Sequence, residues 1–321
     1  MAAEIINKRA EWVALLRERF NISPSDSPCG WPVAKIRASI AGEYPRFRNS
    51  SVRVIRRGHA LVVELDNRCI FKHVWHPRAN LKTEIEVLGR LKGRLGIETP
   101  DPVFIGRGCK FFGYPRIKGN KPDRKVIGCW SPEKRSRLAS ELVALCGRVQ
   151  EAIPLKDRLR VLGPKPGPVG GNEIDDVARR FRAIFYGSKR LITASRKVFD
   201  AYKRGQKRLA SGRIAFVGFD LQFDNLLLDS AGRLVGAVDF GYLTWSDAPG
   251  LFGLLYKDDP ELAEMVMAGF ERFAGGRISA EQAKAQGLFS VWSYLVEVST
   301  NRWDMASRRG EFLNIAKRFS R

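Results

Sequence analysis

The chain has 321 residues, of which 44% are hydrophobic and 28% charged, a mixture that can bury the core of one large or two ordinary domains. No apolar run reaches the roughly 20 residues that a membrane-spanning helix needs, and the charged N-terminal stretch lacks the apolar centre of a secretory signal. Five cysteines without a Cys-x-x-Cys pair, and only three histidines, argue against a disulfide scaffold or a structural zinc site. We therefore expect a globular cytoplasmic protein.

The net charge of +22 is concentrated in the first two thirds of the chain, and the densest stretch, 177–213, holds 12 Lys or Arg residues and one acid. A surface of this kind attracts polyanions such as nucleic acid or an anionic membrane. Alternatively, the basic surface only keeps the protein soluble. The charge therefore does not identify a partner by itself. A polyanion contact through 177–213 is a hypothesis at this stage.

The N-terminal segment 1–48 is predicted to be helical, with an amphipathic helix near its start and a second short helix over 31–44. Three runs rich in β-branched and aromatic residues follow it. They predict strands at 51–57, 60–66 and 69–75, separated by short polar turns.

An amphipathic pattern over 80–96 predicts a helix that ends at a glycine. Two further strand-like runs, 102–108 and 110–119, complete an expected sheet of five strands. After this point the pattern becomes helical. The Ser-Pro pair that opens 131–153 is a capping signal for a long helix.

A Gly/Pro-rich loop at 162–171 separates this helix from a basic helical region. Short strands are predicted at 214–217, 225–229 and 234–239, and the rest of the chain is predicted to be helical. The sequence thus predicts an α+β fold with a small five-stranded β lobe and a larger helical lobe. We expect this division of the chain: a helical extension over 1–48, a small lobe over 49–117 and a large lobe over 118–321.

The stretch VGFDLQFDNLLLDSAGRLVGAVDFG, from Val217 to Gly241, carries the residues of greatest chemical interest. Asp220 lies in a loop, Asn225 begins a strand five residues later, and Asp239 ends the strand that returns. A strand–turn–strand pair would bring Asn225 and Asp239 to one edge, where both could bind Mg²⁺ through oxygen. Asp220 would then face an acceptor hydroxyl and take its proton.

The order Asp-x4-Asn followed by Asp-Phe-Gly resembles the aminoglycoside phosphotransferase branch of the protein-kinase-like superfamily, whose pattern is HGDLxxxNxLxD…GxxxGxIDFG. The resemblance covers about 51–252 and implies the two-lobed protein-kinase-like fold. It also implies ATP or GTP as phosphate donor, Mg²⁺ as cofactor, Asp220 as catalytic base, and Asn225 and Asp239 as metal ligands.

On the small lobe, the resemblance assigns a phosphate-binding lysine to the third strand and its ion-pair partner to the following helix. Glu84 is our choice for the partner, with Glu86 as the competing residue. The connection between the lobes would meet the nucleobase through its backbone. The implied cofactor-binding residues are Lys72, Glu84, Arg116, Ile117 and Lys118.

The chain departs from the family pattern at Gly218, where the family carries a histidine, and at Phe219, where it usually carries glycine or arginine. In related folds this histidine supports the loop and is neither the base nor a metal ligand. Because the residues with direct chemical roles are all present, we expect an active phosphotransferase. A nucleotide-binding pseudokinase is the alternative.

The sequence gives the least information about the molecule that accepts the phosphoryl group. The resemblance implies a hydroxyl of a small molecule, such as a sugar or an aminoglycoside-like compound, and leaves open a macromolecular or anionic acceptor (protein, RNA or a lipid-linked saccharide). Acids near the C-terminus could line an acceptor pocket or simply be half-exposed helical side chains: Asp258, Asp259, Glu261, Glu264, Glu271, Glu297 and Asp304.

Overall fold

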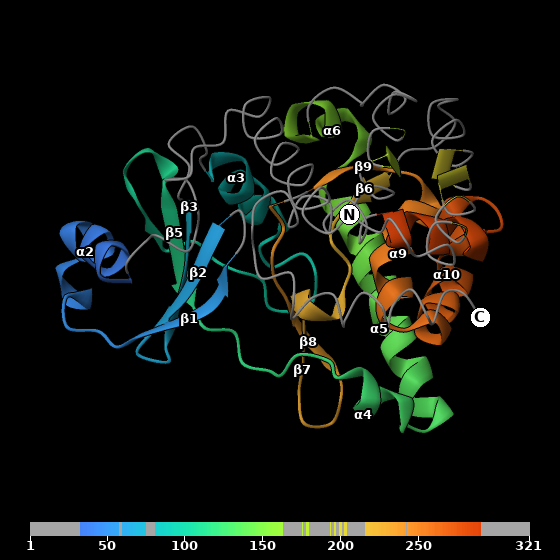
Figure 1. Cartoon of the computed structure of the whole chain (residues 1–321), viewed down its shortest axis with the longest axis horizontal. Coiled ribbons are helices and arrows are strands. Elements are labelled where there is room, and N and C mark those ends of the chain that lie inside the picture. The colour runs from blue at the N-terminus through green and yellow to red at the C-terminus, as the bar shows by residue number, and fades with distance from the viewer. Residues whose placement is uncertain are drawn as a thin grey trace, which may run out of the picture.

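The structure, a computed structural model, describes residues 33–57, 60–74, 81–162, 216–241 and 243–289, with a few single residues between 175 and 203 (Figure 1). The predicted N-terminal amphipathic helix, nearly all of the 162–171 loop and the far C-terminal helices lie outside the described residues. Most of the basic 177–213 segment does too. Within the described part, no helix is long and apolar enough to cross a membrane.

The small lobe contains the expected five-stranded sheet, in the order β1-β2-β3-β5-β4 with every neighbouring pair antiparallel. The prediction of five strands is confirmed, although the fourth is much shorter than the pattern indicated, because a 3-10 turn (Arg107–Cys109) follows it. The strands are β1 (Val52–Arg57), β2 (Ala60–Leu65), β3 (Cys69–Val74), β4 (Phe104–Ile105) and β5 (Phe111–Pro115).

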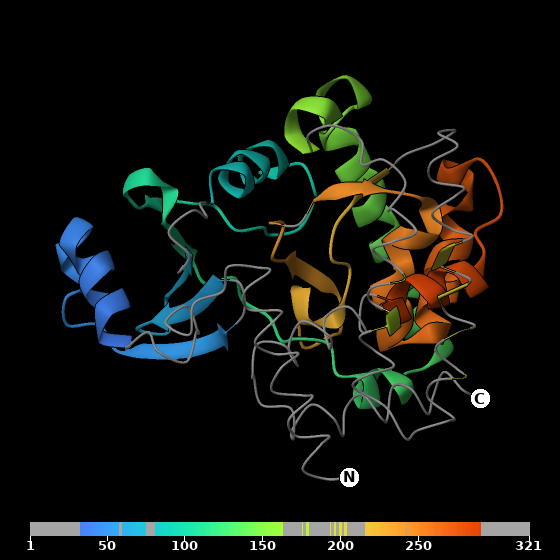
Figure 2. The ribbon, with the colours of Figure 1, turned by 45° about the horizontal axis from the view of Figure 1, so that its top comes forward.

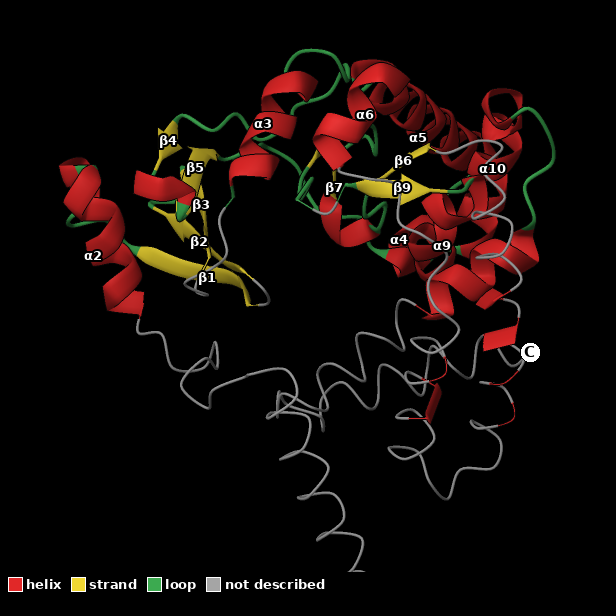
Figure 3. Cartoon of the chain, turned by 90° about the horizontal axis from the view of Figure 1, so that it is seen from above, coloured by secondary structure: helices red, strands yellow, loops and turns green. Residues whose placement is uncertain are grey.

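Alternation along the strands gives the sheet two different faces. Phe71 on β3 and Phe111 on β5 point to one face, where they pack with the buried Ile36 and Ile40 of α2 (Val33–Glu43). Tyr44 and the short 3-10 turn Pro45–Phe47 add further aromatic contacts there. The helix α2 therefore covers the outer face of the small sheet (Figure 3).

The opposite face of the sheet turns toward α3 (Lys82–Leu91) and the large lobe. The register places Lys72 opposite Val62 on β2 and Phe112 on β5, so these side chains share this face. Phe112 and Ile70 belong to the same apolar cluster as the core of the large lobe. The small sheet is thus buried on both sides, and its inner face carries the lysine.

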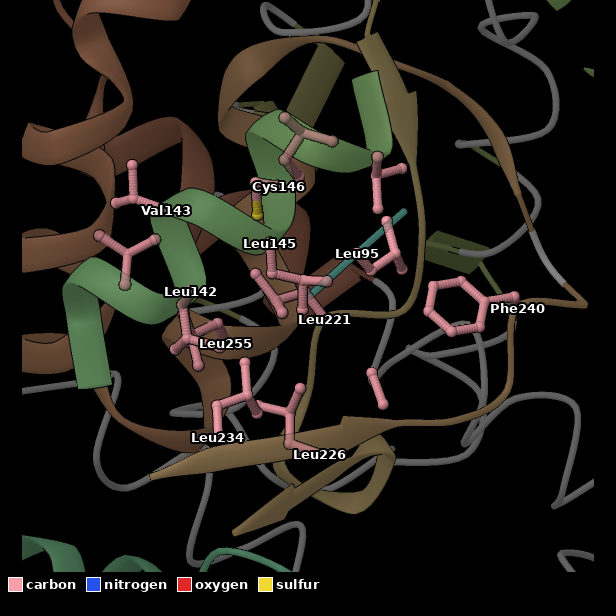
Figure 4. Packing of buried hydrophobic residues seen from close by; sticks show 14 of the residues in the cluster. Leu95, Leu142, Val143, Leu145, Cys146, Leu221, Leu226, Leu234, Phe240 and Leu255 are labelled. Carbon is pink, nitrogen blue, oxygen red and sulfur yellow. The ribbon is translucent and has the colours of Figure 1, made fainter. Parts of the chain in front are cut away.

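The large lobe is built around the long helix α5, which begins as the Ser-Pro signal predicts: the Ser131 hydroxyl accepts from Lys134 N at 3.3 Å. Leucines of α5 pack against α9 and the β7–β8 hairpin, as Figure 4 shows for Leu142, Leu234 and Leu255. The labelled helices of this lobe are α4 (Arg124–Gly128), α5 (Pro132–Ala152), α6 (Leu155–Leu162), α9 (Ala248–Asp258) and α10 (Pro260–Ala274).

Two small antiparallel pairs carry the motif, and the β7–β8 hairpin lies on the side of the large lobe that faces the small lobe (Figure 2). Strands β7 and β8 form the predicted hairpin, while β6 pairs with β9, a strand that the sequence pattern did not indicate. A 3-10 turn separates β6 from β7. The elements are β6 (Phe216–Gly218), the turn η5 (Phe223–Asn225), β7 (Leu226–Leu228), β8 (Leu234–Ala237) and β9 (Thr244–Ser246).

Backbone hydrogen bonds hold both edges of the β7–β8 hairpin, and those of Glu98 tie it to the small lobe. Asn120, just past the lobe connection, exchanges two bonds of 2.8 Å with Leu228. Glu98, which follows α3, donates to Val235 O at 2.9 Å and accepts from Ala237 N at 3.0 Å. The hairpin therefore belongs to both lobes, and the residues at its end are placed relative to each of them.

Candidate functional site

A three-residue ion cluster bridges the lobes. Lys72 Nζ lies 2.9 Å from Glu84 Oε1 and 2.7 Å from Asp239 Oδ1. The side chains of all three are 5–12% exposed. Glu84 is buried in the first turn of α3, whereas Glu86 is exposed. The lysine of β3 thus meets the helix of its own lobe and the Asp-Phe-Gly segment of the other.

Burial disfavours the charged form of the Lys72 ammonium, but the two carboxylates outweigh this effect and raise its pKa above the usual value. Lys72 is therefore a cation at any physiological pH. Burial raises the pKa of Glu84, and Lys72 opposes that shift. Tyr114 lies near the same charges, and burial raises the pKa of its phenol. The cluster thus holds the Lys72 ammonium between a carboxylate of the small lobe, Glu84, and one of the large lobe, Asp239.

The backbone around Asp239 is adapted to this contact. Asp239 has a φ of 64°, in the left-handed region that non-glycine residues other than Asn and Asp rarely adopt. At Gly241, an added Cβ would lie 2.6 Å from Glu84 Oε2 and 3.1 Å from Lys72 Nζ. A side chain at position 241 would therefore displace the ends of Glu84 and Lys72 from their ion pair.

Asn225 ties the loop from Asp220 to Asn225 together and joins it to the end of β8. The Asn225 amide donates to Asp220 O at 3.0 Å, and Asn225 O accepts from Val238 N at 2.8 Å. Asn225 is 3% exposed, and Asp220 is half-buried. The structure therefore brings Asp220, Asn225 and Asp239 together at the end of the β7–β8 hairpin, as the strand–turn–strand pattern leads one to expect.

Gly218 has no room for a side chain. It pairs with Thr244 across β6 and β9, and an added Cβ would lie 2.8 Å from the Cβ of Ser246. The next residue, Phe219, packs its ring against Phe240 of the Asp-Phe-Gly segment, with ring centroids 5.7 Å apart. An aromatic contact from Phe219 thus links the Asp220 loop to the Asp-Phe-Gly segment, without any side chain at 218.

A glutamine on α5 supports the strand that leads into the loop. The Gln150 side chain donates to Val217 O at 3.0 Å and accepts from Val217 N at 2.8 Å. The Gln150 amide therefore satisfies the backbone N–H and C=O of Val217, as a neighbouring strand would on this edge of β6. Sequence reasoning missed Gln150, because a glutamine within a long helix carries no local signal of such a contact.

The lobe connection contains the predicted nucleobase segment, Arg116 to Lys118. Arg116 N donates to Arg68 O at 2.7 Å, and its guanidinium binds the carboxylate of Glu64 and the side chain of Asn67. Ile117 is buried under Gly236 of β8. The connection is therefore anchored to both lobes, while its contact with a nucleobase stays a prediction.

Asn225 and Asp239 supply two hard oxygen donors at one edge, which fits Mg²⁺, an ion that prefers oxygen and usually completes its shell with water and substrate phosphates. Among the described residues, no three His, Cys, Asp or Glu side chains gather into a metal-binding group. The donor set therefore fits a magnesium ion that is held jointly with a nucleotide rather than by the protein alone.

The described acids of the C-terminal part all have protein partners. Asp258 accepts from Phe223 N, Asp259 and Glu261 pair with Arg135, Glu264 accepts from Tyr256, and Glu271 accepts from Ile278 N. Glu297, Asp304 and most of 177–213 lie outside the described residues. Nothing in the described structure supports a polyanion contact.

The chain is similar to known proteins in sequence pattern and in fold. A sequence model of the phosphotransferase enzyme family matches residues 48–280. No curated protein sequence matches the chain. The fold prediction, a two-lobed protein-kinase-like α+β fold, is confirmed by similar solved structures, which cover 88–89% of this chain and 97% of their own.

Three of these structures illustrate the range. The GDP complex of aminoglycoside 2'-phosphotransferase-IIIa has a TM-score of 0.70 at 19% identity. The ADP-bound aminoglycoside phosphotransferase APH(2'')-Ib has a TM-score of 0.60 at 14% identity, and macrolide 2'-phosphotransferase type I has 0.58 at 17%. At these identities the likeness establishes the fold, and the family match covers most of the chain.

Proposed function

This chain belongs to the phosphotransferase enzyme family, and on that premise we propose that it transfers the γ-phosphoryl group of ATP or GTP to a hydroxyl of a small molecule, with Mg²⁺ as cofactor. The observation that carries the proposal is the cluster of Lys72, Glu84 and Asp239, which joins the two lobes beside the Asp220–Asn225 loop. The nucleotide would lie between the small lobe (49–117) and the large lobe (118–321).

In this proposal each residue has one task. Lys72, held by Glu84, binds the phosphates of the nucleotide, and the backbone of Arg116, Ile117 and Lys118 meets the base. Asn225 and Asp239 would hold the magnesium ion. When bound, Mg²⁺ would offset the negative charge of the phosphates.

Asp220 acts as the base. Its carboxylate takes the proton of the acceptor hydroxyl as that oxygen forms a bond to the γ-phosphorus. The bond between the γ-phosphorus and the bridging oxygen breaks, and the nucleoside diphosphate leaves. Gly218 is no obstacle in this scheme, because the aromatic contact of Phe219 with Phe240 ties the same segments together.

A small-molecule acceptor is supported by the names of structurally similar proteins, which include an aminoglycoside and a macrolide phosphotransferase. A cytoplasmic location is part of the proposal, supported by the unpaired thiols among the described residues: Cys69, Cys109, Cys129 and Cys146.

The test combines γ-labelled ATP or GTP, Mg²⁺, an aminoglycoside and macrolide panel, and a cell extract, and then separates small molecules, lipid, RNA and protein. We expect label in the small-molecule fraction and its loss in Asp220→Asn and Asp239→Asn. Label in the RNA, lipid or protein fraction would instead identify a macromolecular acceptor. Nucleotide binding without any transfer would identify a pseudokinase.

Glu84 and Glu86 provide a matched pair of variants on one helix. Glu84→Gln removes the carboxylate that holds Lys72, whereas Glu86→Gln changes an exposed side chain two residues away. We expect transfer to fall about 10- to 100-fold in the first variant, since a misplaced phosphate ligand costs rate on this scale. The second variant should match the wild type.

A further inference from the structure

The catalytic loop receives a hydrogen bond acceptor from a distant helix. Asp258 is the last residue of α9, and its Oδ2 accepts from Phe223 N at 2.7 Å. Its other oxygen lies 3.2 Å from Lys257 Nζ, which also donates to the side chain of Gln222 at 3.2 Å. The Asp258 side chain is 16% exposed, so this is a mostly buried carboxylate on the loop backbone.

The contact satisfies a need of the turn itself. Phe223 begins the 3-10 turn that ends at Asn225, and the first N–H groups of such a turn have no partner within it. A residue before the turn commonly supplies a side-chain acceptor. Here that residue is Gln222, which makes no capping bond. Instead, the Asp258 carboxylate of α9 accepts the hydrogen bond from Phe223 N.

The turn controls the placement of both functional residues of the loop. Asn225 ends the turn, and its amide donates to Asp220 O at 3.0 Å. Gln222 N donates to the same carbonyl at 3.0 Å. A change in the turn therefore moves the residue that binds the metal and the carbonyl of the residue that acts as base.

Because these contacts form one chain, we propose that Asp258 is a positioning residue, which caps the turn at Phe223 and thereby sets Asp220 and Asn225 for phosphoryl transfer. The role rests on the proposed function of those two residues. A charged acceptor suits the task, because hydrogen bonds to a carboxylate are stronger than those to a neutral oxygen. Lys257 holds the carboxylate and Gln222 together.

The neighbouring Asp259 offers a matched control. Its carboxylate accepts from Leu262 N at the start of α10 and pairs with Arg135 of α5 at 2.9 Å. The two consecutive aspartates thus serve different elements, one the catalytic loop and the other the packing of two helices. Both variants should lose some stability, but only the loss of Asp258 should change the loop.

The experiment measures two properties of Asp258→Ala and Asp259→Ala: amide hydrogen exchange of the 218–226 segment without nucleotide, and basal hydrolysis of γ-labelled ATP and GTP with Mg²⁺. For Asp258→Ala we expect faster exchange and a kcat lower by roughly 10- to 100-fold, with little change in KM for the nucleotide. Asp259→Ala should leave both readings near wild type. If the alanine variants do not fold, Asp258→Asn and Asp259→Asn repeat the comparison with a smaller change.

Two outcomes would overturn the role: unchanged exchange in Asp258→Ala, or faster exchange with wild-type kcat. If the wild type hydrolyses neither nucleotide and transfers no label, the proposed function fails and the positioning role falls with it. Hydrogen exchange distinguishes this outcome from a failure of the Asp258 contact. It measures the stability of the turn at Phe223 without nucleotide and without turnover.

Discussion

Two glycines mark the residues around which the site is most tightly built. At Gly241 a side chain would meet the Lys72–Glu84 pair, and at Gly218 it would meet Ser246 of β9. The obstacle at Gly218 is the first side-chain carbon of a residue on a paired strand, which cannot swing away as the end of a long side chain can. Space, rather than chemistry, therefore decides what residue 218 can be.

This geometry predicts that restoring the histidine of the family pattern does not improve the protein. Gly218→His should lower the free energy of unfolding by about 1–3 kcal/mol, the usual cost of overpacking a buried site, and should lower transfer as well. Chemical denaturation measures the first effect. Ser246→Gly removes the obstructing carbon. Gly218→His should therefore cost less stability in the Ser246→Gly background than in the wild type. A single variant as stable as the wild type would contradict the argument.

Phe219 gives a second prediction at this scale, since its ring is the contact between the loop and Phe240. Phe219→Ala should reduce kcat, because the Asp239 segment loses an aromatic partner that is worth about 0.5–1.5 kcal/mol beyond its buried area. Phe219→Leu keeps apolar bulk and should lose less. Steady-state kinetics on both variants provides the check, and equal kcat values in all three proteins would count against the contact.

At the scale of elements, the lobe connection is held by a buried carboxylate on β2. Glu64 is 3% exposed and accepts from Arg53 Nε at 2.6 Å, while Arg116 Nε lies 3.1 Å from its other oxygen. The arginine partners are 67% and 41% exposed, so water can solvate them if the carboxylate is lost. The cost of losing it should therefore be modest for a buried ion.

Glu64→Gln should lower the free energy of unfolding by roughly 1–2 kcal/mol and raise KM for the nucleotide several-fold with little change in kcat. The reason is that Arg116 belongs to the connection that we expect to meet the base. Lys92→Gln, which breaks the exposed pair with Asp101, serves as control and should change neither value. An effect on kcat alone would place Glu64 outside the nucleotide site.

The elements that sequence analysis predicted well are those with a local signal. Runs of β-branched and aromatic residues marked the strands around Lys72, and a Ser-Pro cap marked the start of α5. The missed features depend on contacts between distant residues. Strand β9 is three residues long and exists because it pairs with β6, and Asp258 reaches a loop 35 residues earlier. Periodicity carries no information about such pairs.

At the scale of the whole molecule, the two lobes share one hairpin and one ion cluster. Backbone bonds from Asn120 and Glu98 hold the β7–β8 hairpin, and Lys72 reaches Asp239 beyond its end. A nucleotide that binds Lys72 and a metal that binds Asp239 would therefore act on the same contact from opposite lobes. Their effects on the stability of the whole molecule should be linked.

Ligand binding should accordingly raise the melting temperature, and by more with Mg²⁺ and nucleotide together than with nucleotide alone. A ligand at 100 times its Kd stabilises the folded state by about 2.7 kcal/mol. Asn225→Ala removes one proposed metal ligand, so it should lose the increment that depends on Mg²⁺ and keep the metal-free increment. Lys72→Ala should reduce both. Because thermal shift needs no turnover, the measurement also holds for a pseudokinase, and equal shifts with and without Mg²⁺ would argue against the assignment of Asn225 and Asp239.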